Sequence, residues 1–274
     1  MKLQEEWVEL PGKMRGHRAR PADVEGPLPG VLVIQEIWGA DEHMRDIAAR
    51  VASAGYVALA PDLFSRGGGR PPALSEERVA EVKRFMETVA PASWPNLMDP
   101  EKRGGELARL PDAERARVDE TVGALFSPHV FGMMATYATE LVEVAAWLRA
   151  SPSCAGRKIG AMGFCMGGGL AGALAALDPA LGAAAIFYGT PPTDDAIAKI
   201  ACPLLGLFGA DDARLVGLLP AFEESMKRHE KSLELHVYPA TPHAFFNDTR
   251  GSYRVESARD AWARTLSLFA RALA

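Results

Sequence analysis

One cysteine of this chain lies within a glycine-rich turn signal, Gly163-Phe164-Cys165-Met166-Gly167-Gly168. The apolar run before it, Lys158 to Met162, is typical of a buried strand, and the Ala/Leu/Gly-rich run after it, Gly169 to Leu177, has helical length. Cys165 is therefore predicted to occupy a tight strand-to-helix turn, whose small neighbours let strand and helix approach closely. The helix N-terminus would favour the thiolate. The pattern G-x-C-x-G predicts a nucleophile elbow with cysteine in place of serine, and a buried, inert cysteine is the simpler alternative.

An acid and a histidine follow the cysteine at two later strand ends. The predicted buried strand Leu204 to Phe208 leads into Gly209-Ala210-Asp211-Asp212, and the alternating run Glu234 to Tyr238 leads into a loop with His243. Open α/β sheets build their sites at the carboxyl ends of strands. The order nucleophile, acid, histidine predicts a catalytic triad of Cys165, one of the two aspartates and His243. Taken singly, the two aspartates would be a turn or a helix cap, and the histidine a solvated side chain.

Strands and helices alternate along the chain, without internal repeats or a low-complexity linker. This alternation predicts an α/β fold with a mostly parallel central sheet covered by helices on both faces, in one domain of residues 1–274. The other predicted strands are Val8 to Leu10, Lys13 to Arg20, Val31 to Glu36, Tyr56 to Ala60 and Ala183 to Tyr188. The other predicted helices are one capped by Asp41 and ending near Ala54, and those near Glu76 to Ala90, Thr136 to Ala150, Leu219 to Glu230 and from Tyr253 onward.

The segment of about residues 63–132 is too long for an ordinary connection between elements. It contains a predicted helix, Asp112 to Phe126, and a stretch, Pro91 to Gly105, in which Trp94 and Met98 form an apolar patch among charges. Because the segment leaves the sheet at the carboxyl end of a strand, we expect a lid that helps to choose the substrate. A surface insertion unrelated to catalysis is the open alternative.

Charge and cysteine content exclude several classes of protein. The formal net charge of −5, the isoelectric point near 5.8 and the scattered Lys and Arg residues argue against a nucleic-acid partner. Three cysteines, an odd number, fit a reducing compartment. The first ten residues lack the apolar core of a signal peptide, and the run Leu170 to Leu177 is too short to cross a bilayer. We therefore expect a soluble, cytoplasmic protein without a membrane partner, either a monomer or a small homo-oligomer.

The chain carries no signature of a metal or nucleotide cofactor. Its six histidines lack H-E-x-x-H or Cys/His spacing, and no P-loop is present. The glycines around Gly160 lack the G-x-G-x-x-G form and a following acidic ribose anchor. We expect no cofactor and no metal.

The sequence resembles the dienelactone hydrolases of the α/β-hydrolase superfamily from about Gly30 to its end. A Gln-Glu pair and the cysteine elbow together are specific to that family, whereas the acid and histidine segments occur across the superfamily. The matching segments are Gln35-Glu36-Ile37-Trp38-Gly39, Ala60-Pro61-Asp62-Leu63-Phe64, Gly163-Phe164-Cys165-Met166-Gly167-Gly168, Gly206-Leu207-Phe208-Gly209-Ala210-Asp211-Asp212 and Tyr238-Pro239-Ala240-Thr241-Pro242-His243-Ala244-Phe245-Phe246. The resemblance implies the α/β-hydrolase fold and a hydrolase of esters or lactones.

The resemblance also implies a role for each residue of the triad. Cys165 would attack the carbonyl carbon, and the backbone N–H groups of Met166 and Ile37 would receive the oxyanion. His243 would act first as general acid and then as general base, through a thioester acyl-enzyme. Asp212 matches the acid position of the family, although the register that uses the aspartate before it stays open.

Glu36 stands at the end of a predicted strand that is otherwise apolar. By itself it could merely cap the following loop. The resemblance implies a sharper role, because in dienelactone hydrolases the glutamate here is displaced by substrate and takes the thiol proton. An unperturbed cysteine, with a pKa of about 8.5, is only a few per cent thiolate near neutrality. A permanent thiolate would be exposed to oxidation, so ionisation that depends on substrate avoids both problems.

One position departs from the family pattern, so the pattern does not identify the substrate. Family enzymes that act on dienelactone hold its carboxylate with arginines, one of them four residues after the histidine, where this chain has Asn247. An amide cannot form the bidentate, charge-assisted pair that arginine forms. Asn247 itself remains a candidate substrate-binding residue, and the candidate replacement cations are Arg250, Arg66, Arg70 and Arg84. The candidate walls of an aromatic pocket are Trp38, Tyr188, Phe245 and Phe246, each of which could equally be ordinary core. A general carboxylesterase, a thioesterase and a non-catalytic ligand-binding protein are the alternatives to a lactone hydrolase.

Overall fold

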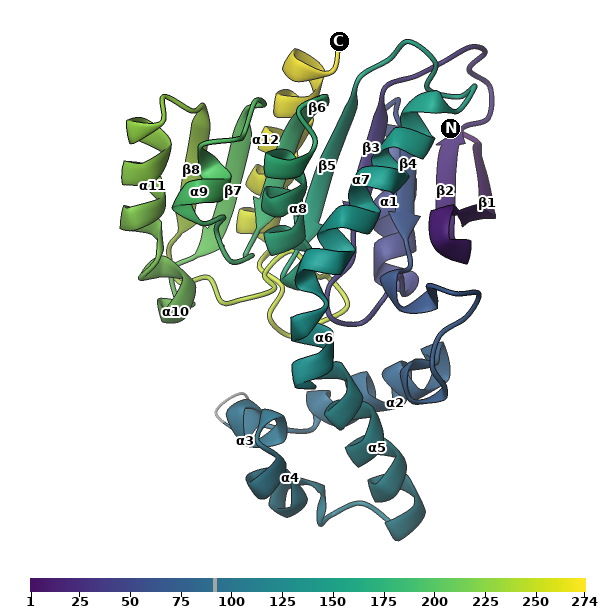
Figure 1. Ribbon diagram of the computed structural model, residues 1–274. Coiled ribbons are helices and arrows are strands. Elements are labelled where there is room, and N and C mark those ends of the chain that lie inside the picture. Colours follow the sequence, from purple (N-terminus) through teal and green to yellow (C-terminus); the bar gives the residue numbers. More distant parts are fainter. Residues whose placement is uncertain (91–92) are drawn as a thin grey trace.

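The centre of the molecule is a mostly parallel β-sheet (Figure 1). In the computed structural model, which describes residues 1–90 and 93–274, the sheet has eight strands in the order β1-β2-β4-β3-β5-β6-β7-β8. β1 and β2 form an antiparallel hairpin that pairs antiparallel with β4, and the other neighbours are parallel. The strands are β1 Leu3–Leu10, β2 Met14–Pro21, β3 Gly30–Ile34, β4 Val57–Pro61, β5 Ile159–Phe164, β6 Leu181–Phe187, β7 Leu204–Gly209 and β8 Leu233–Tyr238.

Helices cover both faces of the sheet (Figure 1). α1 (Glu42–Ser53) and α12 (Val255–Ala272) lie on one face, and α7 (Met134–Ala150) and α8 (Met166–Leu177) lie on the other. As predicted, Asp41 caps α1, because its carboxylate accepts a hydrogen bond from a backbone N–H of the first turn at 3.1 Å. The shorter helices near the sheet are η1 Pro11–Lys13, η2 Leu63–Ser65, η3 Pro72–Leu74, α9 Asp194–Ile197, α10 Ala213–Val216 and α11 Leu219–Arg228.

The order in which strands join the sheet reverses beside β3. β4 lies on one side of β3 and β5 lies on its other side, so the loops after β3 and β5 are neighbours at the carboxyl edge of the sheet. In open α/β sheets, ligands bind in the crevice at such a reversal. Glu36 and Ile37 follow β3, and Cys165 follows β5. The topology therefore brings together residues that are well over a hundred positions apart in the sequence.

Five helices of the described residues form a layer of their own beyond the carboxyl edge of the sheet (Figure 1). They are α2 Glu76–Glu87, α3 Trp94–Met98, α4 Pro100–Leu107, α5 Asp112–Leu125 and α6 Pro128–Gly132. Apolar side chains of this cap, such as Val82 and Val122, belong to the same buried cluster as those of the sheet. We therefore propose one domain with an inserted cap of about residues 63–132. Of the expected apolar stretch Pro91 to Gly105, residues 91–92 lie outside the described residues.

The predicted fold class is confirmed, and individual elements differ from their predictions mainly at the ends. β1 begins at Leu3 rather than Val8, because Glu5 and Glu6 on this edge hairpin obscure the apolar pattern of a strand. α8 begins at Met166 rather than Gly169, because close packing requires glycines within its first turn. No helix among the described residues combines the length and the apolar character needed to cross a membrane.

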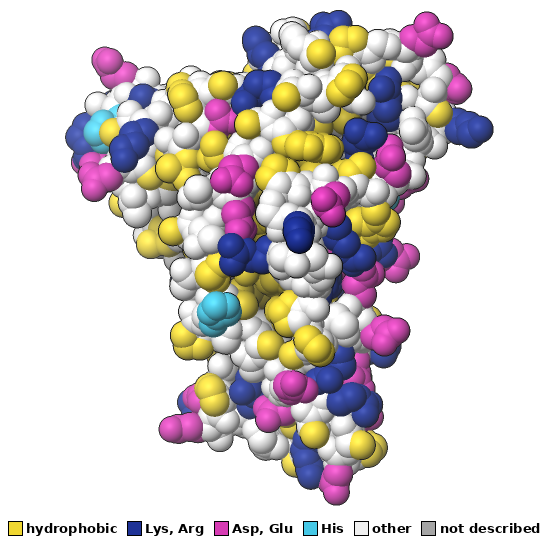
Figure 2. Space-filling model, turned by 45° about the vertical axis from the view of Figure 1, so that its right-hand side comes forward, with side chains coloured by type: hydrophobic (Ala, Val, Ile, Leu, Met, Phe, Trp, Pro, Cys, Tyr) yellow, Lys and Arg dark blue, Asp and Glu magenta, His cyan; other side chains and the backbone are white. Residues whose placement is uncertain are grey.

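Charges of both signs are mixed on the surface. Lys and Arg side chains alternate with Asp and Glu over the face shown in Figure 2. Over the molecule as a whole many charges pair, as Arg117 does with Glu81 at 2.6 Å and Arg149 with Asp178 at 2.7 Å. A face of this kind offers no extended cationic field to a polyanion.

Candidate active site

Cys165 occupies a strained turn between β5 and α8. Its φ of 54° and ψ of −114° lie in a region that residues with a Cβ rarely adopt. The turn is held because strand and helix pack backbone against backbone: a Cβ on Gly163 would overlap Gly167, and one on Gly167 would lie 2.7 Å from the carbonyl carbon of Ile34. The backbone N–H of Cys165 donates to the carbonyl oxygen of Phe187 at 3.0 Å. These contacts hold the sulfur-bearing residue at the N-terminus of α8.

The aspartate and the histidine meet at the neighbouring strand ends. Nδ1 of His243 lies 2.6 Å from Oδ2 of Asp212, whose other oxygen caps α10 by accepting from the backbone N–H of Leu215 at 3.3 Å. The loop of His243 reaches Asp212 because Gly209 lacks a side chain, and a Cβ there would lie 2.8 Å from the carbonyl oxygen of Pro242. Asp211 is exposed, and the imidazole bonds its neighbour instead. The geometry thus selects Asp212, rather than Asp211, as the partner of the imidazole.

Electrostatics join the imidazole to the cysteine as well. Burial alone lowers the pKa of His243, but the charge of Cys165 and the hydrogen bond and charge of Asp212 outweigh burial and raise that pKa to about 10. Burial raises the pKa of Asp212, and the hydrogen bond from His243 and its charge reverse this effect and hold the pKa below its ordinary value. A positive imidazolium next to negative groups explains both the raised pKa of His243 and the lowered pKa of Asp212. The arrangement therefore stabilises the imidazolium of His243 whenever Cys165 is ionised, with the Asp212 carboxylate behind it.

Replacing Cys165 by alanine is expected to lower the pKa of His243. The sulfur supplies the largest of the contributions that raise it, so the pKa should fall from about 10 toward the ordinary value of 6.5, by roughly one pH unit or more. NMR titration of the ring Cε1–H signal measures this directly. Cys202→Ala, which removes a buried thiol elsewhere, is the matched control and should leave the titration unchanged. An unaltered His243 titration in Cys165→Ala would contradict the coupling.

Glu36 is buried and both of its carboxylate oxygens are occupied. Oε1 accepts from the hydroxyl of Tyr188 at 3.2 Å, and Oε2 accepts from Nδ2 of Asn247 at 2.7 Å. The amide of Asn247 is oriented by Thr249, whose backbone N–H and hydroxyl donate to its oxygen at 3.1 and 2.7 Å. Asn247 itself has no exposed surface. In this structure Asn247 therefore holds Glu36 with a neutral donor and presents no cation to a substrate.

Tyr188 was predicted only as a wall of an aromatic pocket or as core, and its contacts with Glu36 and His243 were not predicted. It follows β6 with a φ of 39° and is fully buried, and its ring meets the His243 ring edge to face with centroids 5.0 Å apart. Burial and the negative charges of Glu36 and Cys165 raise its pKa well above the ordinary value, so its hydroxyl stays a donor. The available signal was an aromatic residue before Gly189 at the end of a strand beside the elbow strand.

The candidate oxyanion donors lie on the two loops that flank the reversal. Met166 is the first residue of α8, where backbone N–H groups have no acceptor within the helix. Ile37 lies in the loop after β3, and both residues are buried. They come from neighbouring parallel strands, β5 and β3, so their N–H groups can converge beside Cys165.

Among the other candidate substrate-binding residues, Arg250 and Trp38 lie together, and Arg66 lies apart from them. The Arg250 guanidinium sits over the ring of Trp38 at 5.3 Å and over the ring of the cap residue Trp94 at 5.7 Å. Such stacking is a cation–π contact that joins the His243 loop, the β3 loop and the cap. Arg66 instead forms an ion pair with Glu140 of α7 at 2.7 Å and is half exposed.

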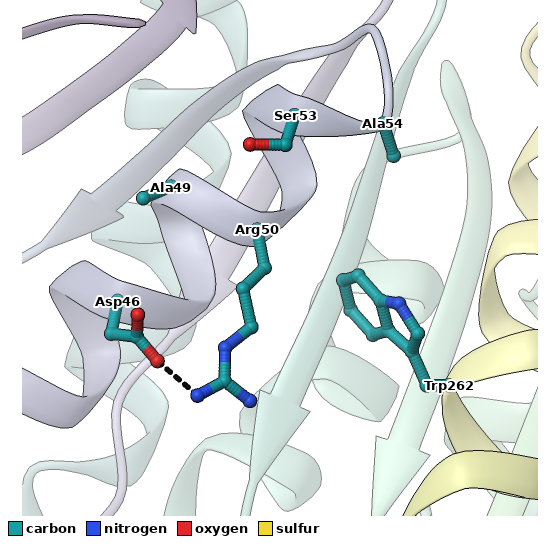
Figure 3. Close-up of a pocket in the computed structure, with 6 residues that line it drawn as sticks. All are labelled: Asp46, Ala49, Arg50, Ser53, Ala54 and Trp262. Carbon is teal, nitrogen blue, oxygen red and sulfur yellow. Dashed lines mark ion pairs between the residues drawn. The ribbon is translucent and has the colours of Figure 1, made fainter. Parts of the chain in front are cut away.

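A surface hollow of about 430 Å³ lies between α1 and α12 (Figure 3). Figure 3 shows Arg50 directed toward Asp46 within it, and the same guanidinium pairs with Asp248 at 2.5 Å. The lining residues are Asp46, Ala49, Arg50, Ser53, Ala54 and Trp262. None of them is a candidate catalytic residue. Elsewhere in the part of the chain that the structure describes, no group of three or more His, Cys, Asp or Glu side chains is arranged to hold a metal ion.

A family model and curated relatives place the chain in one family. The family model described as the dienelactone hydrolase family matches residues 14–273. A protein of Saccharolobus solfataricus named carboxymethylenebutenolidase is 35% identical over 267 residues, which covers 94% of each chain. A protein of Escherichia coli K12 with the same name is 30% identical and covers 93% of this chain and 82% of its own.

Solved structures share the fold of this chain. A dienelactone hydrolase structure from Klebsiella pneumoniae subsp. pneumoniae is 28% identical, has a TM-score of 0.70, and covers 99% of this chain and 100% of its own. The dienelactone hydrolase-like promiscuous phosphotriesterase P91 from metagenomic libraries has a TM-score of 0.72 at 20% identity, with all of both chains covered. At that identity, P91 shows a shared fold alone.

Proposed function

Because the chain belongs to the dienelactone hydrolase family and is a hydrolase like its relatives, we propose that it cleaves a small ester or lactone through a thioester on Cys165. The observation that carries the proposal is the placement of His243 between Asp212 and the elbow cysteine. Nδ1 of His243 lies 2.6 Å from Oδ2 of Asp212, and both neighbours together raise the pKa of His243 to about 10. Such an arrangement makes a nucleophile and an acid available in one site.

The proposed reaction has two halves. The Cys165 thiolate attacks the carbonyl carbon, and the oxyanion is stabilised by the backbone N–H groups of Ile37 and Met166. As the tetrahedral intermediate collapses, the carbon–oxygen bond to the leaving group breaks, and His243 gives its proton to the departing alkoxide. His243, now neutral, takes a proton from water, and the hydroxide adds to the thioester. Collapse then releases the carboxylic acid and restores the thiolate and the imidazolium.

Glu36 is proposed to accept the thiol proton of Cys165 when substrate displaces it from its resting position, and to return that proton to the sulfur once product has left. Its carboxylate is held there by two neutral donors, Tyr188 and Asn247. Neutral hydrogen bonds hold a carboxylate less strongly than a guanidinium would, because charge-assisted bonds are roughly twice as strong. Glu36 is therefore free to move without breaking an ion pair.

Arg250 is proposed as the cation that receives an anionic part of the substrate, in place of the arginine absent at Asn247. Arg250→Met should raise KM for a carboxylate-bearing lactone or ester by roughly 10- to 100-fold, because one charge-assisted hydrogen-bonding partner is lost. KM for neutral 4-nitrophenyl acetate should change little. Arg254→Met, in the same loop but bonded only to backbone carbonyls, is the control for steady-state kinetics. Equal effects on both substrates would contradict the anchor.

Three substrates test the proposed function itself. Turnover of dienelactone or 4-nitrophenyl acetate supports the lactone and ester reading, and a clear preference for an acyl thioester would replace it with a thioesterase. Binding of these compounds without turnover would instead favour a ligand-binding protein.

Cys154, Cys165 and Cys202 are free thiols, as expected in a reducing compartment. We therefore propose a cytoplasmic enzyme, a monomer or small homo-oligomer, that acts on small molecules without a cofactor.

A further inference from the structure

A buried ion pair lies beside the loop that carries Ile37. Asp62 directly follows β4 and has no exposed surface, and its Oδ2 accepts from Nε of Arg70 at 2.7 Å. The Arg70 side chain is itself only 5% exposed. Arg15 approaches the same carboxylate oxygen at a longer distance, 3.4 Å. Burying two charges is costly unless they pair in good geometry. The ion pair with Asp62 therefore fixes where the Arg70 guanidinium lies.

The guanidinium of Arg70 packs against the bare Cα of Gly39. A Cβ on Gly39 would lie 2.7 Å from Cζ of Arg70 and closer still to Nη2. Gly39 also has a φ of +83°, which other residues rarely adopt. Only glycine therefore allows this contact, and the contact lies two residues beyond Ile37 in the same short loop.

Hydrogen bonding does not fully account for where the guanidinium lies. Nη1 donates to the carbonyl oxygen of Leu74 at 3.3 Å, whereas the buried Nη2, the atom nearest Gly39, has no acceptor among the described residues. A buried donor without an acceptor costs free energy. The ion pair with Asp62 therefore fixes one side of the guanidinium, and the Nη2 side is held against Gly39 without a hydrogen bond of its own.

The other end of the same loop is also attached to the segment after β4. Oε1 of Gln35 accepts from the backbone N–H of Leu63 at 2.9 Å. The loop of residues 35–40 is therefore held at its start by Gln35 and near its end by the contact of Gly39 with Arg70. Ile37 lies between these two points. An oxyanion donor must lie within about 2.7–3.1 Å of the oxygen it stabilises, so small shifts of this loop matter.

We propose that Arg70, oriented by Asp62, is a positioning residue that holds the backbone N–H of Ile37 in place for the oxyanion. The inference rests on the proposed function and adds to it a role for residues that never touch the substrate. Its consequence is specific: loss of Arg70 should impair steps that form an oxyanion and spare the nucleophilicity of Cys165.

Arg70→Met is the direct test. We expect kcat for 4-nitrophenyl acetate to fall roughly 10- to 100-fold with KM within about twofold, because misplacing one donor weakens binding of the transition state and not of the ground state. The rate of Cys165 alkylation by iodoacetamide should stay within about twofold of wild type, since alkylation at a saturated carbon forms no oxyanion. Arg117→Met, which removes an exposed arginine–carboxylate pair in the cap, should change neither rate.

The double variant Asp62→Asn/Arg70→Met removes both buried charges, so it extends the test if Arg70→Met fails to fold. Thermal melting shows which variants are folded, and the double variant should show the same loss of kcat. An unchanged kcat in a folded variant would overturn the inference alone. So would a parallel fall of kcat and alkylation rate, because that would indicate general damage to the site. A wild-type protein without turnover would overturn the proposed function and this inference together.

Discussion

Cys165→Ala is expected to lower kcat for 4-nitrophenyl acetate by about 10⁴-fold or more, to the background of the oxyanion donors alone. The sulfur forms the bond to the acyl group, so no other side chain can replace it in the proposed reaction. Its strained φ of 54° and its place at the N-terminus of α8 present it for attack. Initial rates of purified wild type and variant, each with and without iodoacetamide, measure the effect, and wild type should lose its activity to the reagent.

The other two cysteines provide matched controls for both substitution and alkylation. Burial raises the pKa of the Cys154 thiol to about 11 and that of the Cys202 thiol to about 11 as well. At neutral pH they are protonated and poorly nucleophilic. Cys154→Ala and Cys202→Ala should therefore keep wild-type activity and its sensitivity to iodoacetamide. Substantial hydrolysis by Cys165→Ala, or insensitivity of wild type to the reagent, would contradict a cysteine nucleophile.

Short-range patterns in the sequence predicted the fold well. The glycines around Cys165 predict a close strand–helix contact, and the structure shows why each is needed, since a Cβ on Gly163 or Gly167 would meet backbone atoms. Asp41 caps α1 through a bond that spans only three residues. Signals of this kind depend on neighbours in the chain, so a single sequence carries them.

Contacts made by distant residues could not be predicted in the same way. The side chain of Asn247 was expected near the substrate, and instead it holds Glu36, which lies 211 positions away in the chain. Tyr188 holds the other oxygen of Glu36 from another strand end. The partner of a buried polar group depends on strand order, which the local pattern does not contain. The same holds for Arg70 and Gly39, because their contact exists only once β3 and β4 lie side by side.

Asp212→Asn is expected to lower kcat by about 10²- to 10⁴-fold with little change in KM. The carboxylate accepts the bond from Nδ1 of His243 at 2.6 Å and contributes to the raised pKa of that ring. An amide can present its N–H to the ring and so favour the wrong tautomer, and it no longer stabilises the imidazolium. The proton donor for the leaving group is therefore lost over much of the neutral range.

Asp211→Asn is the matched control, because it removes the same charge from the adjacent residue. Asp211 is exposed, whereas the Asp212 side chain is only 11% exposed and faces His243. Steady-state kinetics with 4-nitrophenyl acetate should therefore separate the two variants by at least about 10²-fold. Equal losses would mean that the total negative charge near the site matters rather than one oriented carboxylate. A larger loss in Asp211→Asn would move the acid to the other register of the Asp-Asp pair and require the loop of His243 to lie differently in the working enzyme.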